Sequence, residues 1–305
     1  MATTEQRVGN WGRWGDDDER GTLNLLTPDV VLTATKVPRT GKTYSLALPI
    51  QRSGVPILDY RGAPMRLALT HQSDVGMFEA YGAPDHVGAN EDVIVLASHN
   101  ETHMDALCHV FSERRLYNGV PAETVTAAAG ATKLGIDKVG AIVGRAVLLD
   151  MAGFLGVERV EAPRIFTGDE LLACARHEGV EIRAGDILLI RTGWVEAFLA
   201  NAAAGGSDDA LLMQPGIGLD ACRTIAQLDV AAVGCDNSAV EAIPFDEDRF
   251  LGVHIELLVK LGLPLVEHLV LSELAADRCY ESLFVAAPLP VTGGTGSPLN
   301  PVCIG

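Results

Sequence analysis

Hydrophobic and polar positions alternate in blocks along the chain, and the blocks predict both strands and helices. Apolar runs of strand length occur at 141–150, 186–191, 230–234 and 282–287. Stretches of helical periodicity separate them, at 168–177, 193–203, 218–227 and 253–262, and an earlier helix is expected from Pro28 to about Val37 behind a Thr27 cap. Because strands buried on both faces alternate with helices, the pattern predicts an α/β domain with a mixed or largely parallel sheet.

The first third of the chain has a different pattern. Residues 42–50 and 64–70 alternate enough to be strands, whereas 53–60 and 76–90 are rich in Gly, Pro and Asp and predict either binding loops or ordinary surface excursions. No internal repeat or Pro-rich linker divides the chain, so we expect one domain over residues 1–305, with 1–26 as an N-terminal arm. This arm contains two tryptophans, whose large apolar side chains we expect to pack against the body of the fold or against a partner subunit.

Composition excludes several classes of partner. The 48% hydrophobic content is enough for a large core, and 23 basic against 40 acidic residues give a net charge of −17 with no basic run. Nucleic acid and anionic membrane are therefore not expected as partners. The N-terminus does not resemble a signal peptide and no apolar run approaches the ~18 residues of a membrane span, so a cytoplasmic protein is expected. The six cysteines form no CxxC pair, which argues against a zinc knuckle or a disulfide framework.

Residues 98–109 concentrate the candidate chemistry. Three of the eight histidines lie here in the order H-x3-H-x-D-x3-H, directly after the apolar run 93–97, which we expect to be a rigid strand that delivers the ligands. The spacing fits a helical face or an extended chain and does not decide between them. Neutral imidazole and carboxylate suit Zn²⁺ or Mn²⁺, and three protein ligands leave positions for water and substrate. The alternative is a set of histidines that lie at the surface or are satisfied within the core.

A second pair of candidate ligands lies far along the chain. His254 is on a predicted apolar helix, and Glu267 is in a short apolar strand, where a carboxylate is costly to bury unless it is paired or binds a metal. If Asp105 bridges, His254 and Glu267 can complete a second metal site. The alternative is that both side chains face solvent.

These residues resemble a known family. The segment His99-Asn100-Glu101-Thr102-His103-Met104-Asp105, with His109 four residues later, is similar to the H-x-G-T-H-x-D motif of the metal-dependent cyclase-like hydrolases, which include bacterial kynurenine formamidase and isatin hydrolase. The resemblance extends to Trp14–Asn24, Gly234–Ser238, the His254 to Glu267 pair and Thr295–Pro301, and so covers nearly the whole chain.

The resemblance implies a swivelling β/β/α fold and a homodimer or homotetramer. It implies one or two divalent ions, Zn²⁺ or Mn²⁺, held by His99, His103, Asp105, His254 and Glu267, and it implies His109 as the general acid/base. Glu101 stands where the motif has glycine, which matters if that position needs a positive φ. Its carboxylate could also act as a ligand, an acid/base or a substrate contact, so Glu101 is a second candidate catalytic residue.

The expected function is therefore metal-dependent hydrolysis. Metal-bound hydroxide would attack the carbonyl of a small amide, lactam or related cyclic substrate, and His109 would pass a proton to the leaving nitrogen. Two alternatives remain: a lyase or cyclase that uses the same metal, and a non-catalytic relative that binds a metal or a small molecule. Tyr60, Phe78 and Tyr81 in the early loops could stack on a planar substrate or simply pack.

Overall fold

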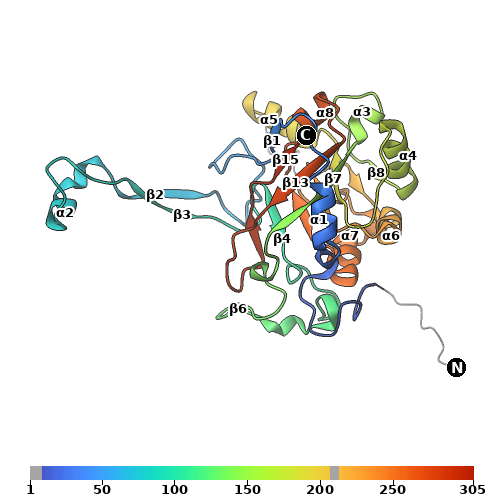
Figure 1. Cartoon of the computed structure of the whole chain (residues 1–305), viewed down its shortest axis with the longest axis horizontal. Helices are drawn as coiled ribbons and strands as arrows, with labels where there is room; N and C mark the ends of the chain where they lie inside the picture. Colours follow the sequence, from blue (N-terminus) through green and yellow to red (C-terminus); the bar gives the residue numbers. More distant parts are fainter. Residues whose placement is uncertain (1–8, 207–212) are drawn as a thin grey trace.

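A large mixed sheet runs through the body of the molecule. The computed structural model describes residues 9–206 and 213–305, and in these residues nine strands form one sheet in the order β1-β15-β13-β7-β9-β11-β12-β4-β14 (Figure 1). Their bounds are β1 Thr43–Ser45, β4 His103–Asp105, β7 Ile142–Asp150, β9 Ile187–Arg191, β11 Ala232–Cys235, β12 Leu265–Glu267, β13 Glu281–Ala286, β14 Gly296–Pro298 and β15 Val302–Ile304.

The centre of the sheet is parallel and its edges are antiparallel. Strands β7, β9, β11 and β12 run parallel, whereas the outer strands pair antiparallel. Nearly every residue of β7, β9 and β11 is buried, as expected for parallel strands covered on both faces. The predicted α/β domain with a mixed sheet is confirmed.

Helices connect the parallel strands and cover the sheet. Helix α4 begins behind a Thr167–Glu170 capping box and ends at Gly179, whose φ is +74°. In Figure 1 it lies beside α6 (Leu219–Leu228), on the side of the molecule away from the strands at Met65–Thr70 and Glu91–Val95. The helices are α1 Pro28–Ala34, α2 Val75–Ala80, α3 Met151–Phe154, α4 Gly168–Glu178, α5 Trp194–Ala203, α6 Leu219–Leu228, α7 Gly252–His254 and α8 Ser272–Ala276.

Two predicted elements of the body differ from the structure. The helix expected at 253–262 is a single α turn, α7, that continues as a π-helix over Ile255–Leu261. The strand expected at 42–50 is confined to β1, because the backbone then leaves the sheet and the Leu48 N–H donates to the Thr102 side chain.

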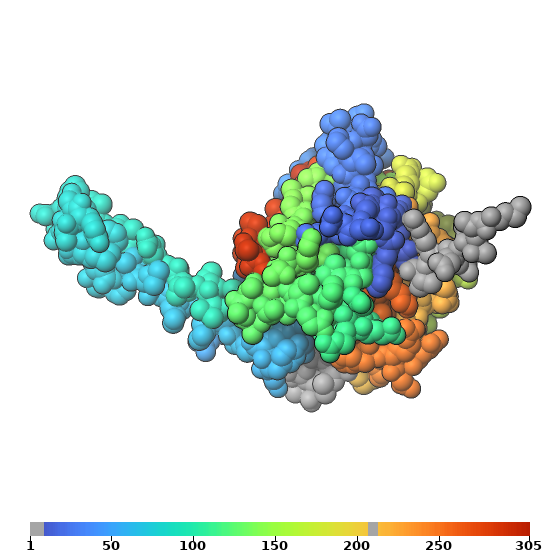
Figure 2. All heavy atoms as spheres, turned by 90° about the horizontal axis from the view of Figure 1, so that it is seen from below, coloured from blue at the N-terminus to red at the C-terminus, as the bar shows by residue number. Residues whose placement is uncertain are grey.

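A long hairpin projects from the body. Among the described strands, β2 (Met65–Thr70) and β3 (Glu91–Val95) pair with each other alone, and they lead to α2 at the tip, far from the sheet (Figures 1 and 2). We call residues 65–95 the projecting hairpin and residues 51–64 its root. The run 93–97 was expected to be a rigid strand that delivers the ligands. That prediction is wrong: most of the run lies in the exposed strand β3, and the ligand strand in the core is β4. The predicted loop 76–90 forms the outer part of this hairpin.

The described part of the N-terminal arm lies against the body. The Trp11 indole donates to the Val259 carbonyl at 2.7 Å, and the Arg13 guanidinium binds both oxygens of Asp229 at 2.5 and 2.6 Å. Residues 1–8 of the predicted arm lie outside the described residues. Among the described helices, none has the length and apolar character needed to cross a membrane.

Candidate metal centre

The centre is built on β4, which lies between β12 and β14. His103 and Asp105 are two residues apart on this strand and therefore share a face. The register places Glu267 of β12 directly opposite His103, and Gly296 of β14 directly opposite Asp105. Strand pairing thus brings a carboxylate from late in the chain next to a histidine from its first half.

His99 reaches the same point from the turn before β4. Its Nδ1 lies 2.8 Å from Asp105 Oδ1, and its Nε2 lies 3.1 Å from the Thr295 hydroxyl. Space for the ring depends on a missing side chain, because a Cβ at Gly296 would lie 2.4 Å from His99 Cε1. The glycine of β14 is therefore required by the imidazole.

His254 enters from the opposite side, as the last residue of α7. Its Nε2 is 3.7 Å from Asp105 Oδ2 and 3.3 Å from Glu267 Oε1. The π-helix begins at the next residue, and such irregular helices are frequent at functional sites. In the described residues two overlapping groups therefore converge, His99–His103–Asp105 and Asp105–His254–Glu267, each with its candidate ligand atoms within 4.8 Å of one another.

The donor set fits a divalent cation. All five side chains are buried. Yet His103 Nε2 and Asp105 Oδ2, which face the other donors, make no hydrogen bond in the described part of the chain. His103 Nε2 is 3.3 Å from Glu267 Oε2, and Asp105 Oδ2 is 3.7 Å from His254 Nε2. Buried polar atoms without hydrogen bonds are costly, and a cation among these donors would satisfy both. Imidazole nitrogen and carboxylate oxygen together suit Zn²⁺ and Mn²⁺, and Asp105 is placed to serve both groups.

The electrostatics of the cluster favour ionised carboxylates. Burial alone raises the pKa of Asp105, but the nearby His109, His99 and His103 outweigh it and hold this pKa well below its usual range. Burial has the opposite effect on a histidine and lowers the pKa of His254. Its contacts with Glu241 and Glu267 outweigh burial and raise this pKa to about 10. A proton on His254 therefore offsets part of the negative charge of the carboxylates, and a bound cation would replace that positive charge.

His109 lies at the solvent side of the cluster. Its ring stacks on that of His99 with centroids 3.8 Å apart, and its Nε2 is 4.0 Å from Asp105 Oδ1. Its side chain is 25% exposed, more than any of the five candidate ligands. Burial lowers its pKa to about 4, so the imidazole is neutral near pH 7 and can accept a proton.

Glu101 occupies the glycine position of the motif with a φ of +38°. Its carbonyl oxygen lies 2.8 Å from His103 Nδ1 and 2.9 Å from His268 Nδ1, so its backbone orients both rings. Burial raises the pKa of its carboxyl group to about 7. Neither carboxylate oxygen makes a hydrogen bond among the described residues, and Glu101 belongs to neither metal group. The backbone of Glu101 thus orients two rings of the centre, and a role for its buried carboxylate stays a prediction.

Three further residues at the centre were missed from the sequence. Glu241 Oε1 lies 2.5 Å from His254 Nδ1, on the side of the ring away from the cluster. Thr295 contacts His99, and His268 stacks on Trp194 with centroids 6.0 Å apart. Glu241 had a signal of its own, since it is an acidic residue within the apolar run 239–243.

Backbone strain also gathers around the centre. Val240 and His268 both have positive φ, +59° and +55°, in addition to Glu101. A positive φ is unusual for non-glycine residues and most of all for a β-branched one, and each such residue costs about 1–3 kcal/mol. Val240 precedes the residue that contacts His254, and His268 follows Glu267, so the strained positions flank the candidate ligands.

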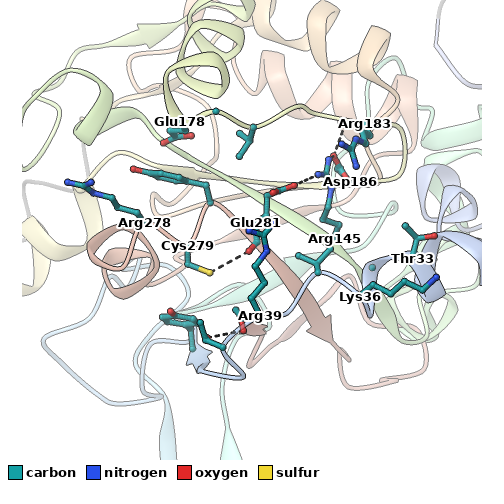
Figure 3. A pocket seen from close by; sticks show the side chains of 18 of the residues that line it. Thr33, Lys36, Arg39, Arg145, Glu178, Arg183, Asp186, Arg278, Cys279 and Glu281 are labelled. Carbon is teal, nitrogen blue, oxygen red and sulfur yellow. Dashed lines mark hydrogen bonds and ion pairs between the residues drawn. The ribbon is translucent and has the colours of Figure 1, made fainter.

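A separate cavity lies at the other end of the sheet. It has a volume of about 960 Å³, and none of the candidate metal ligands lines it (Figure 3). Arg145 lines this cavity and is buried. Its guanidinium forms ion pairs with Asp186 and Glu281, so its positive charge is already neutralised. The cavity is therefore distinct from the candidate site.

Comparisons with known proteins find similar sequences and structures. A family model described as "Putative cyclase" matches residues 44–242. A crystal structure of a novel cyclase covers all of both chains at 34% identity with a TM-score of 0.89. No curated protein matches the chain.

More distant structures share the fold. Isatin hydrolase A from Labrenzia aggregata, bound to benzyl benzoate, is 19% identical with a TM-score of 0.59 over 86% of this chain and 93% of that one. A predicted metal-dependent hydrolase from Bacillus stearothermophilus is 21% identical with a TM-score of 0.53 over 86% and 97%.

Proposed function

Because the chain belongs to the cyclase family, we propose that it is a metal-dependent hydrolase that cleaves a C–N bond of a small amide, lactam or related cyclic carbonyl compound. The observation that carries the proposal is the convergence of five buried donors from three distant segments, with a neutral histidine at their solvent side. The fold shared with an isatin hydrolase, which by name acts on a cyclic compound, supports the choice of substrate class.

The residues have separate tasks in this proposal. His99, His103 and Asp105 hold one Zn²⁺ or Mn²⁺ ion, and Asp105, His254 and Glu267 hold a second where two are bound. Such an ion lowers the pKa of water to about 7 and polarises a carbonyl group. Glu101 acts through its carbonyl oxygen, which fixes the tautomer and direction of His103.

His109 moves the proton. Its ring is held by stacking on His99 while part of it stays open to solvent, where a substrate can approach. A neutral imidazole there can take a proton from the attacking water and deliver it to the leaving nitrogen. Between these two transfers His109 is an imidazolium ion. The ionised carboxylate of Asp105, 4.0 Å from His109 Nε2, stabilises it.

The test combines metal analysis with a substrate panel. Protein purified without chelators is analysed for bound metal and then assayed with N-formylkynurenine, isatin, and a set of cyclic imides and lactams, with Zn²⁺ or Mn²⁺ supplied in turn. The expected result is a stoichiometric divalent ion and turnover that chelation abolishes. Absence of any bound divalent ion would refute the proposal.

Reaction in ¹⁸O water separates hydrolysis from the cyclase alternative. Only hydrolysis must place a solvent oxygen in the product, so an unlabelled product would assign a lyase or cyclase reaction to the same centre. Bound metal without turnover of any panel member would favour a binding protein.

A further inference from the structure

The cavity away from the metal centre is built from four separate segments of the chain. It has a volume of about 960 Å³ and is lined by residues of α1, the end of α4, the start of β13 and strand β1 (Figure 3). Pockets that bind small molecules have volumes of about 300–1,000 Å³, so this cavity can hold a whole ligand. None of the candidate metal ligands lines it, so that ligand would be separate from the substrate of the metal centre.

Many of the charged side chains that line the cavity neutralise one another. Six basic residues contribute to the lining, and three of them form ion pairs with acidic residues. These pairs are Arg145 with Asp186 and Glu281, Lys42 with Asp277, and Arg183 with Glu181. The charge of the cavity is therefore determined by the residues outside these pairs.

Three basic side chains of the lining have no anion. Lys36, Arg39 and Arg278 form no ion pair and no side-chain hydrogen bond with the part of the chain that the structure describes. In Figure 3, Arg278 and Lys36 lie on opposite sides of the cavity, with Arg39 between them. The acidic lining residues outside the pairs are Asp29 and Glu178, so the cations outnumber them. Charges of one sign around a hollow produce a potential inside it, and here that potential favours an anion.

Glu178 contributes little negative charge to this cavity. One of its carboxyl oxygens accepts a hydrogen bond from the Asp150 N–H at 2.8 Å, which fixes the group at the cavity wall. Burial raises the pKa of the carboxyl group to about 7, so a large fraction of it is protonated near neutral pH. A protonated carboxyl group does not repel an anion and can donate a hydrogen bond to it.

The cavity also has an apolar wall. Val30 and Ala34 are one turn apart on α1, Val37 follows this helix, and Val180 lies just beyond α4. An inorganic anion would leave these side chains in contact with water, whereas an apolar group would cover them and remove their surface from water. The lining therefore favours an organic anion over phosphate or sulfate.

We propose that this cavity is a second ligand site, which binds a small organic molecule with an anionic group and an apolar body, such as a medium-chain carboxylate. The anionic group lies toward Arg39 and Arg278, where it completes the missing ion pairs, and the apolar body lies against the valines. The inference is independent of the reaction that the metal centre performs.

Three probes with the same eight-carbon chain separate charge from apolar contact. Octanoate, octanol and octylammonium are titrated into the protein at pH 6.5 and low salt by isothermal titration calorimetry. We expect octanoate to bind once per chain with a dissociation constant at least tenfold below that of octanol, and octylammonium to bind more weakly still. Absence of saturable octanoate binding, or equal binding of octanoate and octanol, would overturn the proposal.

Two variants locate the binding in the cavity. Arg39→Gln with Arg278→Gln removes two unpaired charges, and the dissociation constant of octanoate should rise about tenfold. Thr33→Trp places a large ring at a position of α1 that lines the cavity, and octanoate binding should be lost. If both variants are folded and bind octanoate like the wild type, the proposed site is wrong.

Two matched controls carry the same changes outside the lining. Arg20→Gln with Arg52→Gln removes two exposed arginines that do not line the cavity. Leu32→Trp adds the ring at the neighbouring position of α1, where the native side chain is 61% exposed. Both controls should bind octanoate like the wild type, and circular dichroism checks that every variant is folded.

A carboxylate probe could also bind a metal ion, so the octanoate titration is repeated after treatment with a chelator. Binding in the cavity should survive this treatment, because no candidate metal ligand lines it. Octanoate binding that the chelator abolishes would place the probe at the metal centre and would overturn the proposal.

Discussion

The contact between Glu241 and His254 offers a sharp test of the metal centre, because Glu241 touches the ring without belonging to the cluster. Its Oε1 is 2.5 Å from His254 Nδ1, while Nε2 of the same ring faces Asp105 and Glu267. The carboxylate also accepts hydrogen bonds from the backbone N–H groups of Val253 and His254, at 3.2 and 3.4 Å. It therefore fixes both the tautomer and the position of the ring.

Two substitutions separate charge from hydrogen bonding. Glu241→Gln keeps an oxygen that can accept from Nδ1 but removes the negative charge, whereas Glu241→Ala leaves three donors unpaired. Loss of such a supporting group weakens metal binding by about 10–100-fold, which is about 1.4–2.7 kcal/mol. We expect Gln near the lower limit and Ala near the upper one.

Competition with a fluorescent chelator for Zn²⁺ measures the affinity. The matched control is Glu256→Gln, two residues beyond His254, where the carboxylate binds Lys260 at 2.7 Å on the outside of the π-helix. This control should bind metal like the wild type. If Glu241→Ala binds Zn²⁺ as tightly as the control does, His254 is not a ligand that depends on Glu241, and the geometric argument fails.

Three more predictions follow from single contacts. His109→Ala should lower turnover by about 10²–10⁴-fold while the metal content measured by mass spectrometry stays unchanged, and loss of metal would instead make His109 a ligand. Gly296→Ala should reduce metal content, because its Cβ would lie 2.4 Å from His99 Cε1, whereas Gly76→Ala, with open space around it, should not. Burial raises the pKa of Glu178, beside the far cavity, to about 7, so its contribution to the free energy of unfolding is present below about pH 4.5 and is lost as the pH rises to about 7. Glu178→Gln should therefore flatten the fall in stability over this range in urea unfolding. The expected change is about 2 kcal/mol, because solvent screens this partly exposed carboxyl group, and an unchanged slope would contradict the shift.

Much of the body could be predicted from sequence, because local signals and burial agree there. The helix at 168–177 was predicted from Thr167 and Gly179, and the structure has a capping box and a left-handed residue at these two positions. The apolar run 141–150 coincides with β7, which is buried on both of its faces. Patterns of this kind depend on short-range periodicity and need no knowledge of the partner strands.

The hairpin and the supporting residues could not be predicted in the same way. The run 93–97 has the composition of a buried strand. Nothing in it shows that β3 pairs with β2 in a hairpin that projects from the body. Glu241 and His254 are 13 residues apart, and their contact depends on how the chain between them folds. The pairing of Glu267 with His103 depends on strand register. Such information is three-dimensional, and only the unusual placement of an acid among apolar residues hints at it.

The position of β4 between β12 and β14 has a consequence for biosynthesis. The strand that carries His103 and Asp105 pairs only with strands that a ribosome releases more than 150 residues later. Until Glu267 has emerged, the early histidines have neither their opposite carboxylate nor the ladder that holds them in line. The nascent chain therefore offers an incoming ion an incomplete ligand set, and metal loading becomes a late event that reports completion of the fold.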